Sequence, residues 1–348
     1  MSDLLYSEVE EDLRSSVRGL LADRAAPATV LARAESDDPV DAKLWRALAD
    51  LGATGLPVPE RLGGAGASWR ETAVVLEELG RAVAPVPFFG SAVLATAALL
   101  AVGDETLLPE LAAGAKTATL AVPFSTAPAA TRVEPGSARV TSVADAWLAD
   151  VYLVPAGDTL VAIDAGDVTR TPVTSLDLTR PLADLTFDTA AGRPLGPAGP
   201  AVERALTVGA ALLAAEQLGV AQWCLDTTVE YAKTRRQFAR PIGSYQAIKH
   251  RLADLWVAVT EARAVSRYAA DCLATDDPDT PVAAALAQAY CAPVAVKAAE
   301  EAVQLHGGIG FTWEHPVHLY LKRAKSSAVA LGSPDRHRTA IAKLVDLD

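Results

Sequence analysis

Over the first 115 residues, hydrophobic and polar positions alternate with the spacing of amphipathic helices. Ser7 and Glu10 have the spacing of a capping box, and the apolar residues that follow fall on one helical face. The same spacing predicts further helices at 42–51, 69–83 and 91–102. Pro and Gly residues between 55 and 66 interrupt it as a turn. We therefore predict an N-terminal helical domain over residues 1–115.

A different pattern begins near residue 116 and continues to 199. Apolar and polar residues alternate in short runs separated by Pro, Gly and Asp, which indicates strands joined by turns. The predicted strands are 119–122, 139–143, 151–154, 159–163 and 185–187. This alternation is typical of an antiparallel sheet, so we predict a middle β domain over residues 116–199.

Helical spacing returns at residue 200 and continues to residue 348. Long helices are predicted at 206–233, 246–273 and 281–303, and a shorter one at 316–331. Four antiparallel helices of such length pack as a bundle. The sequence therefore predicts a mixed, mainly α fold, with a helical domain, a β domain and a C-terminal four-helix bundle over residues 200–348.

Composition narrows the class of protein. The chain is 51% hydrophobic, enough for a large core. No run of 18 apolar residues lacks a charge or a helix breaker, and the N-terminus has no basic and apolar signal, so we expect no transmembrane or secretory segment. A net charge of −12 argues against a general nucleic-acid surface. Cys224, Cys272 and Cys291 lack metal-type spacing, which favours buried thiols in a cytoplasmic protein without a metal site.

Two C-terminal stretches carry the candidate chemistry. The first is Arg235-Arg236-Gln237-Phe238 with Pro241-Ile242-Gly243 behind it, and the second is Gln304-Leu305-His306-Gly307-Gly308-Ile309-Gly310-Phe311. Glycines after a helix usually only end it, and paired arginines usually face solvent. The order and spacing of these stretches, followed by the Tyr- and Arg-containing run 318–323, resemble the C-terminal domain of the acyl-CoA dehydrogenase family. That family also has a helix–sheet–helix domain plan.

The resemblance implies FAD as cofactor and a tetramer assembled through the C-terminal domain. In the family pattern the Arg contacts the pyrophosphate of a flavin held mostly by a neighbouring subunit, which suits a planar guanidinium that can pair with two phosphate oxygens. Arg235 stands at that position, with Gln237 and Phe238 beside it. Glycines let a cofactor approach the backbone closely. The residues implied at the adenosine end are Gln304, Gly307, Gly308 and Gly310.

The middle domain departs from the family pattern. The family segment Thr-Glu-Pro-x-x-Gly-Ser-Asp, which holds the flavin ring, is replaced by the run from Val122 to Ala129. The later segment Trp-Ile-(Thr/Ser)-Asn-Gly has no clear counterpart near 146–150. Ser125 and Thr126 can still hydrogen-bond the edge of a ring. We expect the part of the site that holds this chain's own flavin to be eroded, and the part that reaches a neighbour's flavin to be kept.

Dehydrogenation of an acyl-CoA needs a general base, because the α-proton of a thioester is only weakly acidic. The resemblance places a Glu at one of two positions, which here are Leu331 and Gly209. Neither residue can accept a proton. Glu216, two turns after Gly209 on a similar face, is the nearest candidate base. We favour the alternative that Glu216 makes a polar contact between helices or with a partner chain.

Three hypotheses about function follow. The chain resembles the shorter, base-lacking subunit of the actinobacterial steroid-catabolism heterotetramers of this family, in which a homologous partner supplies the catalytic Glu. Alternatively, it is a self-sufficient homo-oligomeric dehydrogenase that uses Glu216 or another carboxylate. A third hypothesis is a flavin-free assembly subunit. The resemblance implies an acyl-CoA substrate and suggests an electron-transfer flavoprotein as the acceptor.

Overall fold

The first helix begins at the capping residue that the sequence predicts. The structure is a computed structural model that describes residues 4–128 and 138–347. Ser7 caps α1 by accepting a hydrogen bond from the Glu10 backbone N–H, and the Glu10 carboxylate accepts one from the Ser7 N–H at 2.7 Å, which confirms the predicted capping box. The N-terminal helices are α1 (Glu8–Arg24), α2 (Pro27–Ala34), α3 (Ala42–Asp50), α4 (Trp69–Ala82), the π-helical η3 (Phe89–Ala95), α5 (Thr96–Val102) and α6 (Leu107–Ala112).

The middle of the chain forms two sheets. The larger has the order β1 (Ala118–Leu120), β3 (Val151–Ala156), β4 (Thr159–Asp164), β7 (Arg193–Pro197), and the smaller has the order β2 (Arg139–Ala144), β6 (Leu182–Phe187), β5 (Val168–Val173). Their strands pair antiparallel except for β1 and β3. That parallel pair differs from the prediction because β2, which lies between them in sequence, belongs to the other sheet and leaves β3 to return alongside β1.

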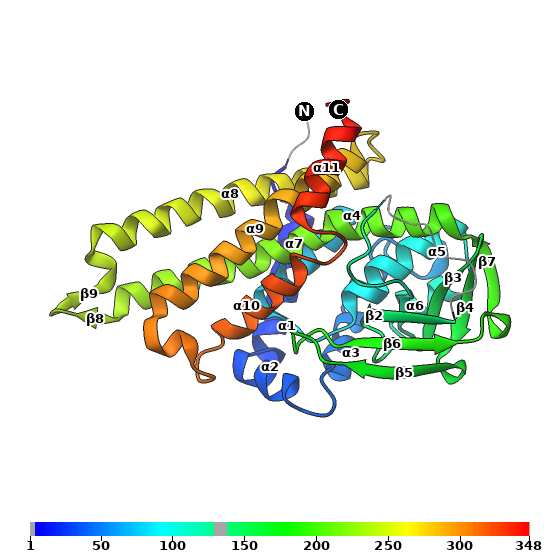
Figure 1. Ribbon diagram of the computed structural model, residues 1–348, viewed down its shortest axis with the longest axis horizontal. Helices are drawn as coiled ribbons and strands as arrows, with labels where there is room; N and C mark the ends of the chain where they lie inside the picture. The colour runs from blue at the N-terminus through cyan, green and yellow to red at the C-terminus, as the bar shows by residue number, and fades with distance from the viewer. Residues whose placement is uncertain (1–3, 129–137, 348) are drawn as a thin grey trace.

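The C-terminal part is built on α7, which runs from the sheets to the far end of the molecule (Figure 1). Its helices are α7 (Ala198–Thr234), α8 (Gln246–Ala274), α9 (Thr280–His306), α10 (Val317–Ser327) and α11 (Pro334–Leu344). The helix predicted at 316–331 already ends at Ser327, and the chain then turns at Leu331 and Gly332, which adopt φ values of 53° and 102°. The four predicted helices are therefore joined by a further one, α11.

The crossing of α4 and α7 depends on two glycines. A Cβ atom on Gly80 would lie 2.1 Å from the Glu216 carbonyl oxygen, and one on Gly219 would lie 1.9 Å from the Glu77 carbonyl oxygen. The two helices therefore touch backbone to backbone, and any side chain at either position would separate them. This contact fixes the middle of α7, where Glu216 lies.

Two stretches of the bundle have the length and apolar composition of a membrane span: α7, and Thr280–Phe311, which includes α9. In their most apolar windows, 89% and 67% of the residues are buried inside the fold. These helices therefore form the core of the protein.

Candidate functional site

The two positions at which the resemblance places a catalytic Glu lie against each other. A Cβ atom on Gly209 would lie 2.9 Å from Leu331 Cδ1 and 2.5 Å from Leu94 Cδ2. Leu331 is fully buried, and its N–H donates to the Phe124 carbonyl oxygen at 2.8 Å. It holds a φ of 53°, which bulky residues rarely adopt. Apolar side chains therefore fill the place where a base from either position would act.

Glu216 is held between two arginines. Its side chain is 2% exposed, and both of its carboxylate oxygens accept hydrogen bonds from Arg180. Arg323 of α10 places Nη1 3.3 Å from Oε2. Burial alone raises the pKa of the Glu216 carboxyl, but the two guanidinium groups outweigh burial and hold that pKa below its usual value. A carboxylate kept ionised and engaged on both oxygens suits a contact between elements better than proton abstraction, so this geometry argues against Glu216 as the base.

The charged network continues into the connection between β5 and β6. Arg323 donates through Nε to Asp177 and through Nη2 to Thr179 Oγ1 at 2.6 Å. The Arg180 guanidinium lies 5.5 Å from the ring centroids of both Phe89 and Phe124. The network therefore joins the sheet region to α7 and α10.

Sequence reasoning missed Asp177 and Arg180, and it met Arg323 only as part of a motif. The run Asp177-Leu178-Thr179-Arg180 carries two charges, but only the structure shows that both are buried and therefore require partners. A second buried acid was also missed: Asp145 accepts a hydrogen bond from the Gly90 N–H at 2.7 Å, and its pKa is raised by burial.

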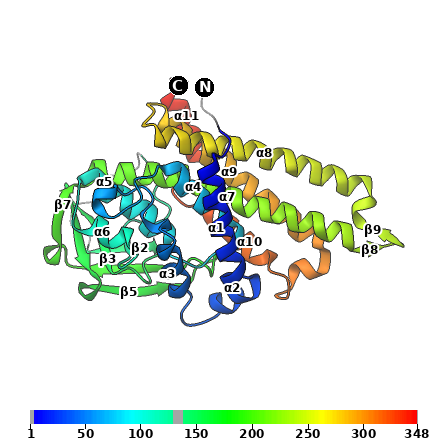
Figure 2. The ribbon, with the colours of Figure 1, turned by 180° about the vertical axis from the view of Figure 1, so that it is seen from behind.

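Arg235 lies at the opposite end of α7, away from the sheets (Figure 1 and Figure 2). Its carbonyl oxygen accepts a hydrogen bond from the Ile242 N–H at 2.8 Å, which closes the hairpin of β8 (Arg236–Gln237) and β9 (Arg240–Pro241). Phe238 at the hairpin tip is 87% exposed, with a φ of 52°. In the part of the chain that the structure describes, the exposed Arg235 guanidinium has no hydrogen-bond or ion-pair partner.

The glycine turn divides into an open part and a packed part. Gly307 has a φ of 62°, and a Cβ on Gly307 or Gly308 would meet no atom within 4 Å. A Cβ on Gly310 would lie only 2.6 Å from the Val303 carbonyl oxygen, so this glycine is needed for packing within the chain. Gln304 is exposed beside the open part.

Ring contacts bring the two motifs to the same end of the bundle. The Tyr231 ring of α7 stacks on the His306 ring of α9 with centroids 4.4 Å apart. Arg235 follows Tyr231 by about one helical turn, and Gln304 precedes His306 by two residues. An unpaired guanidinium, an exposed amide and open glycine backbone fit the phosphate and adenosine portions of FAD, as one side of a shared site.

The segment that would hold the chain's own flavin ring is packed against the turn at Leu331. Its Phe124 accepts the Leu331 N–H, and a Cβ on Gly332 would lie 2.8 Å from the Ala127 Cβ. Beyond this contact lies a cavity of about 330 Å³ between the segment and α7, α9 and α11. Its lining is mostly apolar, with Arg336, Lys343 and the carboxylate of Glu203 among its charged members. Sequence reasoning did not single out Glu203.

The arrangement of N-terminal helices, middle sheets and a C-terminal helical bundle defines the acyl-CoA dehydrogenase class of fold. The family model for the acyl-CoA dehydrogenase N-terminal domain matches residues 7–115, and the model for the C-terminal domain matches residues 199–345. The chain belongs to the acyl-CoA dehydrogenase family of oxidoreductases.

Several relatives extend the match over nearly the whole chain. The acyl-CoA dehydrogenase IpdE2 of Mycolicibacterium smegmatis is 42% identical over 331 residues, which cover 94% of this chain and 96% of the relative. A chain of the ChsE4-ChsE5 complex from Mycobacterium tuberculosis superposes with a TM-score of 0.89 at 30% identity and covers all of both chains. A chain of the Tcur3481-Tcur3483 steroid acyl-CoA dehydrogenase variant superposes with a TM-score of 0.87 at 30% identity and covers 98% of each.

Proposed function

We propose that this chain is one subunit of a hetero-oligomeric acyl-CoA dehydrogenase of the cytoplasm, and that a homologous partner chain supplies the catalytic Glu. The observation that carries the proposal is the filled centre of the fold, where Gly209 and Leu331 face each other without a carboxylate. Glu216 does not replace them, because both of its oxygens are engaged by buried arginines. The chain therefore retains the family's fold and lacks a base at its centre.

The residues at the far end of the bundle are what this chain would contribute to the cofactor site of the complex. FAD, when bound, accepts the hydride that leaves Cβ of the acyl-CoA. Arg235 is suited to pair with the cofactor's pyrophosphate, and the Gln304 amide with its adenosine end. Gly307 and Gly308 allow close approach to the backbone, while Gln237 and the exposed Phe238 extend this surface toward the partner. That two structural relatives are named as pairs of different chains supports this assembly.

The test is a visible absorption spectrum together with a native mass, measured on the chain expressed alone and on the chain co-expressed with a homologous partner. We expect little flavin on the chain alone, and a yellow, active complex with about one FAD per two chains. A yellow homotetramer that an acyl-CoA bleaches under anaerobic conditions would overturn the proposal. A complex that assembles without colour after FAD addition would favour a flavin-free assembly subunit.

A second candidate function is a self-sufficient homo-oligomeric dehydrogenase, which the cavity beside Leu331 favours. That cavity has an apolar floor, two cationic side chains suited to phosphate groups, and the carboxylate of Glu203. The test is turnover by the chain purified alone, followed by Glu203→Gln and Glu216→Gln. Loss of this turnover in one variant, with the fold retained, would identify the base. In either case we propose an electron-transfer flavoprotein as the acceptor.

A further inference from the structure

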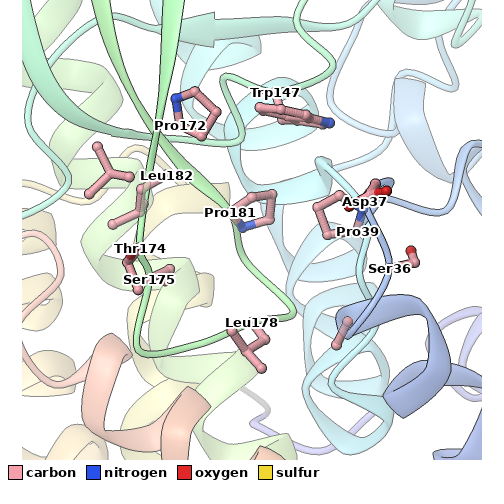
Figure 3. A pocket seen from close by; sticks show the side chains of 12 residues that line it. Ser36, Asp37, Pro39, Trp147, Pro172, Thr174, Ser175, Leu178, Pro181 and Leu182 are labelled. Atoms are coloured by element: carbon pink, nitrogen blue, oxygen red, sulfur yellow. The ribbon is translucent and has the colours of Figure 1, made fainter.

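A groove separate from the sites above lies between the N-terminal helices and the smaller sheet. Figure 3 shows it between the α2–α3 connection, which carries Ser36, Asp37 and Pro39, and the β5–β6 connection, which carries Leu178. Its volume is about 240 Å³. Because it spans a junction between two parts of the fold, an occupant would contact both.

The walls of the groove are flat and apolar. Trp147 lies at one end, and Pro39, Pro172 and Pro181 face the space between the two connections (Figure 3). Indole and proline rings are rigid, so little side-chain entropy is lost when a flat molecule packs on them. This shape favours a ring system over a flexible chain.

The polar groups of the groove indicate which charge an occupant would carry. The Oγ atom of Ser175 is buried and has no hydrogen-bond partner among the described residues, a cost that a ligand hydroxyl or carbonyl would remove. Asp37 adds a carboxylate, and no Lys or Arg is among the residues that line the groove. The lining therefore favours an uncharged occupant over the phosphate-bearing FAD and acyl-CoA, and the guanidinium of Arg170, which bonds to a lining residue, is engaged by the Trp147 carbonyl oxygen.

We propose that this groove binds a small, uncharged, ring-containing molecule with one hydrogen-bonding group directed to Ser175. The proposal does not depend on the subunit role, because no residue of the groove belongs to the centre or the far end described above. An occupant would still affect the buried network at the centre of the fold. Leu178 contacts the groove, while its neighbours Asp177 and Thr179 bind Arg323. Binding would hold this connection in its folded position and raise the melting temperature.

The test uses 2-naphthol, which is neutral and carries one hydroxyl, and 2-naphthoate, which has the same rings and a negative charge. Titrations by calorimetry and ligand-observed NMR on the assembled protein should show saturable binding of 2-naphthol. Binding of 2-naphthoate should be at least about tenfold weaker because of Asp37 and the absence of a cation in the lining. Ser175→Ala should weaken 2-naphthol binding about fivefold, through loss of one hydrogen bond.

Two further variants locate the binding. Trp147→Ala removes one wall and Leu178→Trp fills the space, so each should weaken 2-naphthol binding at least about tenfold. Trp256→Ala is the matched control, since Trp256 is 60% exposed on α8 and should leave binding unchanged. Melting curves show which variants remain folded. Absence of saturable 2-naphthol binding, equal binding of 2-naphthoate, or binding unaffected by Trp147→Ala and Ser175→Ala would each overturn the proposal.

Discussion

The centre of the fold and the far end of its bundle use charged and apolar residues in opposite ways. At the centre, Arg180 and Glu216 are buried and hydrogen-bonded to each other, and apolar side chains fill the space around Leu331. At the far end, the side chains of Arg235 and Phe238 are exposed, and the Arg235 guanidinium has no partner among the described residues. The contrast teaches that the buried charges of the centre hold elements of the fold together, whereas the far end leaves charged and aromatic side chains exposed, as the proposed cofactor and partner contacts require.

The largest effect should come from breaking the central network. Glu216→Ala leaves the Arg180 guanidinium buried without its ion-pair partner and removes one of the two carboxylates that face Arg323, so we expect the free energy of unfolding to fall by about 3–5 kcal/mol. Urea denaturation of the purified protein measures it. Because the pKa of Glu216 lies below its unfolded value, its stabilisation is present above that value and is lost as the pH falls through the folded pKa.

A matched control is Arg251→Ala, which breaks an exposed pair with Glu301 at 2.7 Å and should change the free energy of unfolding by about 0–1 kcal/mol. If Glu216→Gln left stability unchanged and abolished turnover, the carboxylate would be catalytic and the contrast between the two regions would fail.

The next effect should come from the far end. Arg235→Ala removes a charge-assisted pair with a phosphate, so we expect the affinity of the complex for FAD to fall about 10- to 100-fold. Flavin retention of the purified complex during dialysis measures it. Arg236→Ala, which changes the neighbouring exposed arginine, is the control and should retain most of the flavin. An equal loss in both variants would indicate a general effect of charge, not a specific pair.

The packed and the open glycines of the turn at 307–310 should respond differently to substitution. Gly310→Ala places a Cβ 2.6 Å from the Val303 carbonyl oxygen, so it should destabilise the chain by about 1–3 kcal/mol. Gly308→Ala meets no atom within 4 Å and should change stability little, yet weaken FAD binding. Melting temperature and flavin content, measured on both variants, separate the two effects. Retention of full flavin content by Gly308→Ala would contradict a cofactor role for the turn.

The sequence predicted elements with a strong local signal, and it failed where the signal was weak or distant. The capping box at Ser7 and the long runs of α8 and α9 follow from periodicity, and the structure confirms them. Strands β5 and β7 were missed because both contain proline and are largely exposed, which removes the alternation. The pairing of Arg180 with Glu216 joins residues 36 positions apart in different elements, which no local pattern encodes.

The smallest effect should be a dependence of the free energy of unfolding on pH that arises from a histidine at the far end. The His315 ring lies beside that of His306 at the far end, with centroids 4.3 Å apart. Burial, together with repulsion from His306 and His318, lowers the pKa of His315 to about 4. The unfolded chain therefore takes up a proton at His315 first on acidification, so the contribution of His315 to stability should decline from pH 6.5 to about 4 and then level off. Between pH 7 and 5, His315→Gln should lose about 1 kcal/mol less stability than the unmodified protein. The effect is held to this size by the partial exposure of His315.

His250→Gln, at an exposed position on α8, should behave as the unmodified protein. Identical urea curves for His315→Gln and the unmodified protein at both pH values would show that the far end does not set this pH dependence.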